Sequence, residues 1–315
     1  MNFRDSPVRR GRCALAGLVA AITMAACGGG SSQIKDFRAE EVYAFGDEAS
    51  VLTADGRKYS VNALDSSGAR DCAAEPIWVQ RVAALYDLVF AECNPNALPA
   101  TLAFMRAAPG AVAADLSGQI DVVEAAGVVP DHSLATVLMG ANDIWALYAE
   151  YPARSEDELA DASRDRGELI GKQVNRLVAA GVRVLVVTVP DQGLTPRALA
   201  EKAAHTDTDR ARLLTRLTAA LNTAIRLTIV NDGRLLGLVL GDEMVQAMVK
   251  SPRSFGLDET EEPVCTVALP DCTSATLVTD GKSNDYLWAD DRQLAYGGQS
   301  RLGGLALSRA LNNPF

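Results

Sequence analysis

The stretch VYAFGDEAS at residues 42–50 decides the fold of this 315-residue chain. Four mostly apolar residues end in Gly46-Asp47, a pattern typical of a buried parallel strand that stops at a sharp turn. In open α/β folds, ligands bind in the loops just past the carboxyl ends of the strands. The residues that follow Gly46 are therefore the first place to look for a functional site.

Further strands and helices follow in alternation along the chain. Short apolar runs predict the strands, and apolar residues at helical spacing predict the helices. Strands that alternate with helices favour a parallel sheet with right-handed crossovers. Without an internal linker, 41–315 is predicted to be one α/β domain. The expected strands cover 41–45, 102–105, 134–139, 183–189 and 235–240, and the main helices 76–88, 144–149, 155–180, 208–229 and 298–311.

Three segments are predicted to lie outside this alternation. Residues 51–75 are polar and contain the turn signal Asp55-Gly56, which predicts a small hairpin insertion. Residues 191–207 are predicted to form a loop and a helix. Residues 251–287 contain several Pro and Gly and are predicted to be irregular.

Four blocks of the sequence resemble those of the SGNH/GDSL ester hydrolases. The stretch 42–50 resembles the first block, in which a Ser follows Gly-Asp, and GAND at 140–143 matches the Gly-x-Asn-Asp block. Gly110 falls where the family's oxyanion glycine belongs, and Asp290 and Gln293 have the spacing of its C-terminal Asp-x-x-His. The resemblance implies a flavodoxin-like three-layer α/β/α fold with a five-stranded parallel sheet. It also implies carboxylic-ester hydrolysis without a cofactor.

Two positions depart from the family's catalytic triad. The resemblance implies that Gly110 and Asn142 stabilise an oxyanion, but the nucleophile position holds Glu48 and the base position holds Gln293. Gln cannot accept a proton at neutral pH, and a carboxylate is a poor substitute for an activated hydroxyl. Loss of triad members typically costs several powers of ten in rate. The first hypothesis is therefore an SGNH-like protein whose ester hydrolysis is lost or very weak.

The second hypothesis is an active hydrolase with rearranged machinery. Ser50, two residues past the nucleophile position, is a candidate substitute nucleophile, and Glu48 with Asp290 is a candidate carboxylate pair. A third interpretation is purely structural and predicts no open pocket above Asn142. The two histidines, His132 and His205, are not expected to be catalytic.

Several carboxylates could gather around the same pocket. Carboxylates without basic partners suit a hard cation such as calcium, or acid/base chemistry on a sugar. The favoured interpretation is that two of them turn inward to hold loops, so no metal site is expected. The carboxylates concerned are Asp47, Glu48, Asp143, Asp290 and Asp291.

The N-terminal segment is predicted to be an export signal. Four Arg precede an apolar run that ends in small residues before Cys27, a pattern typical of a secretory signal over 1–26. The residues before Cys27 resemble a bacterial lipobox, which implies lipidation of Cys27 and a flexible tether over 27–40. Gly28 after the cysteine favours the outer membrane of a Gram-negative cell envelope. The chain is thus similar to the lipoprotein branch related to autotransporter esterase passenger domains, with a membrane partner through the lipid anchor.

The net charge of the chain indicates which classes of partner to expect. Without residues 1–26 the chain has 26 basic and 39 acidic residues, a net charge of −13. This excess of acidic residues disfavours nucleic acid as a partner, and a small ester or a glycan is the expected ligand.

Four cysteines remain in the exported part, which predicts two disulfides. Of the three pairings, Cys72–Cys93 and Cys265–Cys272 close the shortest loops. No spacing typical of a zinc site is present.

Overall fold

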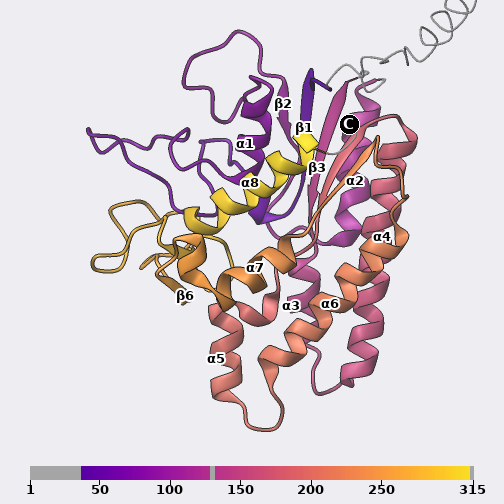
Figure 1. Cartoon of the computed structure of the whole chain (residues 1–315), viewed down its shortest axis with the longest axis vertical. Helices are drawn as coiled ribbons and strands as arrows, with labels where there is room; N and C mark the ends of the chain where they lie inside the picture. Colours follow the sequence, from indigo (N-terminus) through magenta and orange to yellow (C-terminus); the bar gives the residue numbers. More distant parts are fainter. Residues whose placement is uncertain (1–36, 128–131, 313–315) are drawn as a thin grey trace, which may run out of the picture. The chain divides into compact units, whose positions relative to one another are not determined.

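A five-stranded parallel sheet lies at the centre of the chain (Figure 1). The computed structural model describes residues 37–127 and 132–312, which belong to one compact unit. The strand order is β2-β1-β3-β4-β5, the flavodoxin-like order, so the predicted fold is confirmed. The strands are β1 Glu41–Gly46, β2 Ala103–Met105, β3 Ser133–Leu138, β4 Arg183–Val187 and β5 Leu236–Val239.

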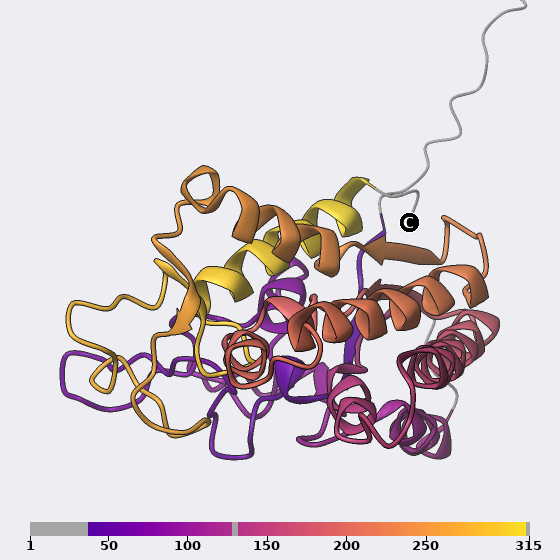
Figure 2. The same cartoon turned by 90° about the horizontal axis from the view of Figure 1, so that it is seen from below.

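Helices cover both faces of this sheet and make three layers (Figure 2). Side chains alternate along β1, so Tyr43 and Phe45 enter one core whereas Val42 and Ala44 enter the other. The first core is closed by α2 Leu116–Ala125, α3 Ala141–Tyr148, α4 Glu156–Ala179 and α6 Arg210–Thr228. The second is closed by α1 Trp78–Leu85, α7 Gly241–Lys250 and α8 Tyr296–Asn312.

Helices begin at capping residues where the sequence contains them. Ser155 and Glu158 form the capping box expected from the sequence, with Glu158 N 3.3 Å from Ser155 Oγ and Ser155 N 2.9 Å from Glu158 Oε2. The helix predicted over 76–88 is shorter, because Ile77 is its N-cap and Asp87 has a positive φ of 60°. After Asp87 the chain turns away from the helix axis.

Two predictions about the loop-rich segments need correction. Part of 251–287 is regular, since β6 Glu259–Pro263 pairs in parallel with β7 Tyr286–Trp288 in a small second sheet. The predicted hairpin in 51–75 contains its turn at Asp55-Gly56, but its strands are reduced to isolated bridges. The insertion after β4 contains helix α5 Pro196–Ala204, as expected.

Both disulfides form between the closest cysteines, and one asparagine joins the two loop-rich segments. Cys72 bonds Cys93, and Cys265 bonds Cys272. The side chain of the buried Asn62 donates to Cys272 O at 3.0 Å and to Pro270 O at 2.9 Å. These bonds fix the 51–75 segment against the C-terminal segment, and both lie on the same side of the molecule (Figure 1).

The predicted signal over 1–26, Cys27 and most of the 27–40 tether lie outside the described residues. Within the ranges that are described, no helix is both long enough and apolar enough to cross a membrane.

Candidate functional site

The candidate site lies where β1 and β3 end. Gly46 pairs with Leu138, and a Cβ at Gly46 would lie 2.0 Å from Leu138 O, so only glycine fits at this strand end. Its φ of 139° turns the chain sharply. The next residue, Asp47, caps the 3₁₀ turn Glu48–Ser50 by accepting a hydrogen bond from Ala49 N at 3.2 Å. The sharp turn expected after Gly46 is therefore present.

The Glu48 carboxylate occupies the space between the two oxyanion donors. Gly110 N donates to Glu48 Oε1 at 2.7 Å, and Asn142 Nδ2 donates to Glu48 Oε2 at 2.8 Å. Both bonds are charge-assisted, which makes them stronger than bonds between neutral groups. Glu48 therefore binds both groups to which the sequence resemblance assigns the role of oxyanion donors.

Two further hydrogen bonds hold these donors in place. Asn142 Nδ2 also donates to Ala111 O at 3.1 Å, which fixes the orientation of the amide. Ala113 N donates to the buried Asp143 carboxylate at 2.8 Å. Asn142 and Asp143 lie in the first turn of α3, which begins at Ala141, three residues before the predicted start. The loop after β2 and the start of α3 are thus joined into one rigid unit.

The C-terminal block reaches the same end of the sheet. Asp290 Oδ1 accepts hydrogen bonds from Arg292 N at 2.9 Å and from Gln293 N at 2.6 Å, and burial raises the pKa of Asp290. The Gln293 side chain is buried and lines a cavity with Asp47 and Ala141. This cavity has a volume of about 20 Å³, enough for roughly one water molecule.

Two buried carboxylates of this region, Asp47 and Asp143, have raised pKa values. Burial, and then the neighbouring charge of Glu48, raise the pKa of Asp47 from an ordinary value near 3.8 to about 7. Burial also raises the pKa of Asp143, although Ala113 N–H and the Arg166 guanidinium, 3.6 Å away, act in the opposite direction. Asp47 and Asp143 both turn inward and hold backbone, as the favoured interpretation predicts.

Ser50 faces the core. Its side chain is fully buried, and its Oγ accepts a hydrogen bond from Trp78 Nε1 at 3.2 Å. This contact fixes α1 against the turn that carries Glu48. The placement favours a structural role for Ser50 over that of a substitute nucleophile.

The remaining sequence candidates lie away from the Glu48 carboxylate or face solvent. His132 precedes β3 at its amino end and stacks on Phe37, and His205 is exposed at the end of α5. Asp291 is exposed. In the described part of the chain, no group of three or more His, Cys, Asp or Glu side chains is arranged to hold a metal ion.

Sequence reasoning missed two residues of this region. Gln192 lines the small cavity and accepts a hydrogen bond from Trp145 Nε1 at 2.9 Å. Its position after β4, at the same sheet edge, was the signal for it. Tyr59 comes from the 51–75 insertion, and burial together with the Glu48 charge raises its pKa. No local pattern in the sequence places Tyr59 near Glu48.

Comparisons with known proteins give distant matches only. No family model and no curated protein matches the chain. Aligned solved structures include a member of the lipolytic G-D-S-L family from Veillonella parvula, with 11% identity, 85% of this chain and 96% of that chain covered, and a TM-score of 0.42. Another is Axe2, an acetylxylan esterase from Geobacillus stearothermophilus, with 15% identity, coverage of 88% and 96%, and a TM-score of 0.43. A putative GDSL-like lipase from Parabacteroides merdae has 12% identity, coverage of 87% and 97%, and a TM-score of 0.44.

The activities in those names belong to those proteins. The fold rests on the sheet order and on the placement of the motifs. The chain has the flavodoxin-like α/β/α fold, and at the end of β1 the Glu48 carboxylate accepts hydrogen bonds from Gly110 N and Asn142 Nδ2.

Proposed function

We propose that this chain is an SGNH/GDSL-hydrolase-like protein of the bacterial cell envelope in which ester hydrolysis is lost or very weak. The observation that supports this most directly is the pair of hydrogen bonds from Gly110 N and Asn142 Nδ2 to the Glu48 carboxylate. Hydrolases of this type need those donors for the oxyanion.

The expected loss of catalytic rate is larger than the loss from the changed triad residues alone. An enzyme without its triad keeps about 10³–10⁴-fold catalysis from the oxyanion hole and substrate binding. Here the Glu48 carboxylate competes for the hole, so that residual catalysis is lost as well.

Hydrolysis of a short-chain chromogenic ester by the mature chain tests the proposal. We expect the native chain to match the uncatalysed background. The double variant Glu48→Ser/Gln293→His frees the donors and supplies a hydroxyl and an imidazole, while Asp290 Oδ1 is already oriented by backbone N–H groups. We expect this variant to hydrolyse the ester above background.

The matched control is Asn142→Ala in the double variant. Removing one oxyanion donor typically costs about 10²–10³ in kcat, so the gained activity is expected to fall by that factor. Native hydrolysis that disappears in Ser50→Ala would refute the proposal and identify Ser50 as the nucleophile. Native hydrolysis that survives Ser50→Ala and disappears in Glu48→Gln would support a carboxylate mechanism instead.

The envelope location is a separate part of the proposal. The signal pattern over 1–26 and the lipobox-like residues before Cys27 support export and lipidation. We expect a clickable fatty-acid analogue to label the native chain in a Gram-negative host and not to label Cys27→Ser. A native chain that remains unlabelled and soluble in the periplasm would contradict lipid anchoring.

A further inference from the structure

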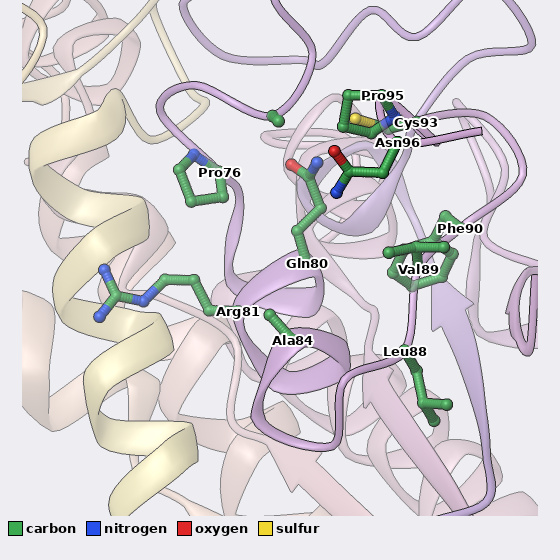
Figure 3. Close-up of a pocket in the computed structure, with 11 residues that line it drawn as sticks. Pro76, Gln80, Arg81, Ala84, Leu88, Val89, Phe90, Cys93, Pro95 and Asn96 are labelled. Atoms are coloured by element: carbon green, nitrogen blue, oxygen red, sulfur yellow. The ribbon is translucent and has the colours of Figure 1, made fainter. Parts of the chain in front are cut away.

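A second hollow lies between α1 and the segment 86–96 (Figure 3). Its volume is about 270 Å³, more than ten times that of the cavity beside Gln293. None of its lining residues belongs to the four motif blocks. Its walls come mainly from apolar side chains, namely Pro76, Ala84, Leu88, Val89, Phe90 and Pro95.

Covalent and backbone bonds form this pocket without a ligand. The positive φ of Asp87 ends α1, and the chain then turns so that Leu88 N donates to Ala83 O at 3.0 Å. The Cys72–Cys93 disulfide fixes the far end of the segment. Gln80 Nε2 donates to Cys72 O at 3.0 Å and ties that cysteine to α1. A pocket fixed in this way costs little to organise when a ligand binds.

The described residues that line the pocket direct no charged group into it. Among the described residues that line it, Arg81 alone is charged, and Figure 3 shows its guanidinium directed away from Leu88 and Phe90. The Arg81 stem lies against Gly303 of α8, since a Cβ there would meet Arg81 Cδ at 2.6 Å. A charged ligand would lose its hydration in this pocket without gaining a partner.

Two amides supply the polar character of the pocket. The Gln80 side chain is already used by the backbone, because its Oε1 accepts from Ile77 N at 3.0 Å and its Nε2 donates to Cys72 O. Asn96 is exposed, and Figure 3 shows its amide next to that of Gln80. One neutral hydrogen-bonding group on a ligand can therefore pair with Asn96 while its apolar part contacts the walls.

We propose that this pocket binds a small neutral molecule with an apolar ring and one hydroxyl or carbonyl group. The size follows from volume, because an apolar cavity of about 150 Å³ accommodates benzene. About 270 Å³ thus accommodates one ring with a short substituent. The Phe90 ring and the Cys93 sulfur in the walls favour an aromatic ring over an aliphatic one.

Three probes of matched shape test the predicted preference for a neutral ligand: benzyl alcohol, benzoate and benzylammonium. Calorimetric or ligand-observed NMR titration of the oxidised mature chain at neutral pH is expected to give at least 10-fold tighter binding for benzyl alcohol than for either ion. Equal affinities for the three probes, or no binding of benzyl alcohol at millimolar concentrations, would overturn the proposal.

Substitutions in the pocket wall test whether benzyl alcohol binds in this pocket. Ala84 is exposed on the pocket wall, so Ala84→Leu fills the space without disturbing the core, and at least a 10-fold loss of benzyl alcohol binding is expected. The control, Ala200→Leu, makes the same change at an exposed position of α5 and is expected to bind as the native chain does. Unchanged binding in Ala84→Leu would show that the probe binds elsewhere. Asn96→Ala is expected to weaken benzyl alcohol several-fold but to leave toluene unchanged.

Discussion

The Glu48 site and the pocket beside α1 differ in whether a side chain of the protein itself occupies the site. At the Glu48 site, Gly110 N–H and the Asn142 amide are bound by a side chain of the protein itself. In the pocket, apolar walls enclose about 270 Å³ that no side chain fills. The two donors of the polar site are thus paired within the chain, whereas the apolar surface of the pocket stays open to water, as is common on folded proteins. The polar site is therefore paired by the chain itself, whereas the apolar pocket keeps space for a ligand.

The largest predicted effect concerns charge at the polar site. Because the pKa of Asp47 is about 7 in the folded chain and near 3.8 when unfolded, the folded state holds an extra proton between these pH values. The contribution of Asp47 to the free energy of unfolding therefore falls as pH rises from about 4 to 7. Asp47→Asn mimics the protonated carboxyl at every pH. We expect its stability relative to the native chain to increase across this window by up to about 4 kcal/mol.

Denaturant unfolding at pH 4, 5.5, 7 and 8 measures this difference. Asp291→Asn, an exposed carboxylate beside the same site, is the control and is expected to differ from the native chain by a nearly constant amount. A constant difference for Asp47→Asn as well would contradict the raised pKa and its origin in burial beside Glu48.

Removal of the Cys72–Cys93 disulfide is expected to affect the two regions unequally. The bond closes a loop with a sequence separation of 21 residues, so the double change to Ser should lower the free energy of unfolding by about 3 kcal/mol. It also frees one wall of the apolar pocket, and benzyl alcohol binding should be lost. The corresponding double change at Cys265 and Cys272 serves as the control, since that disulfide does not line the pocket. Equal losses of binding in both variants would show that the pocket does not depend on its own disulfide.

The sequence was sufficient to predict the fold and the backbone of the polar site. Alternating strands and helices predicted the parallel sheet, and the GAND block at 140–143 lies at the carboxyl end of β3. These features are local, since each depends on a short run of residues. The position of the Glu48 carboxylate is different, because it depends on donors that are 62 and 94 residues away in the chain.

The apolar pocket and the second sheet could not be predicted from the sequence either. The helix predicted over 76–88 ends at Leu85 because Asp87 adopts a positive φ, which is uncommon for a residue other than glycine. That break directs Leu88 and Phe90 into the pocket wall. The pairing of β6 with β7 joins an acidic run to an apolar one, and no periodic pattern in 259–263 indicates a strand.

Replacing the carboxylate by an amide tests how strongly the polar site is satisfied. Glu48→Gln places an N–H₂ group against either Gly110 N–H or Asn142 Nδ2. Asn142 cannot reverse its amide without placing its oxygen against Ala111 O. We expect a cost of about 2 kcal/mol, measured by denaturant unfolding. Glu48→Ala should cost less, below about 1 kcal/mol, because Gly110 is exposed and water can reach both donors. The reverse order would show that Glu48 does not act as the acceptor for these groups.

The smallest predicted effect concerns the buried hydrogen bond between Trp78 and Ser50, beneath the polar site. Ser50→Ala removes the acceptor of the buried Trp78 Nε1–H, and we expect a loss of about 1 kcal/mol in the free energy of unfolding. Ser163→Ala is the matched control, since Ser163 is equally buried and donates to Leu217 O. That carbonyl lies inside α6 and keeps its helical partner, so the control should lose less stability. Equal losses in the two variants would show that Trp78 Nε1–H does not depend on Ser50. Neither variant should change ester hydrolysis, because Ser50 contributes to packing beneath Glu48 and not to reaction above it.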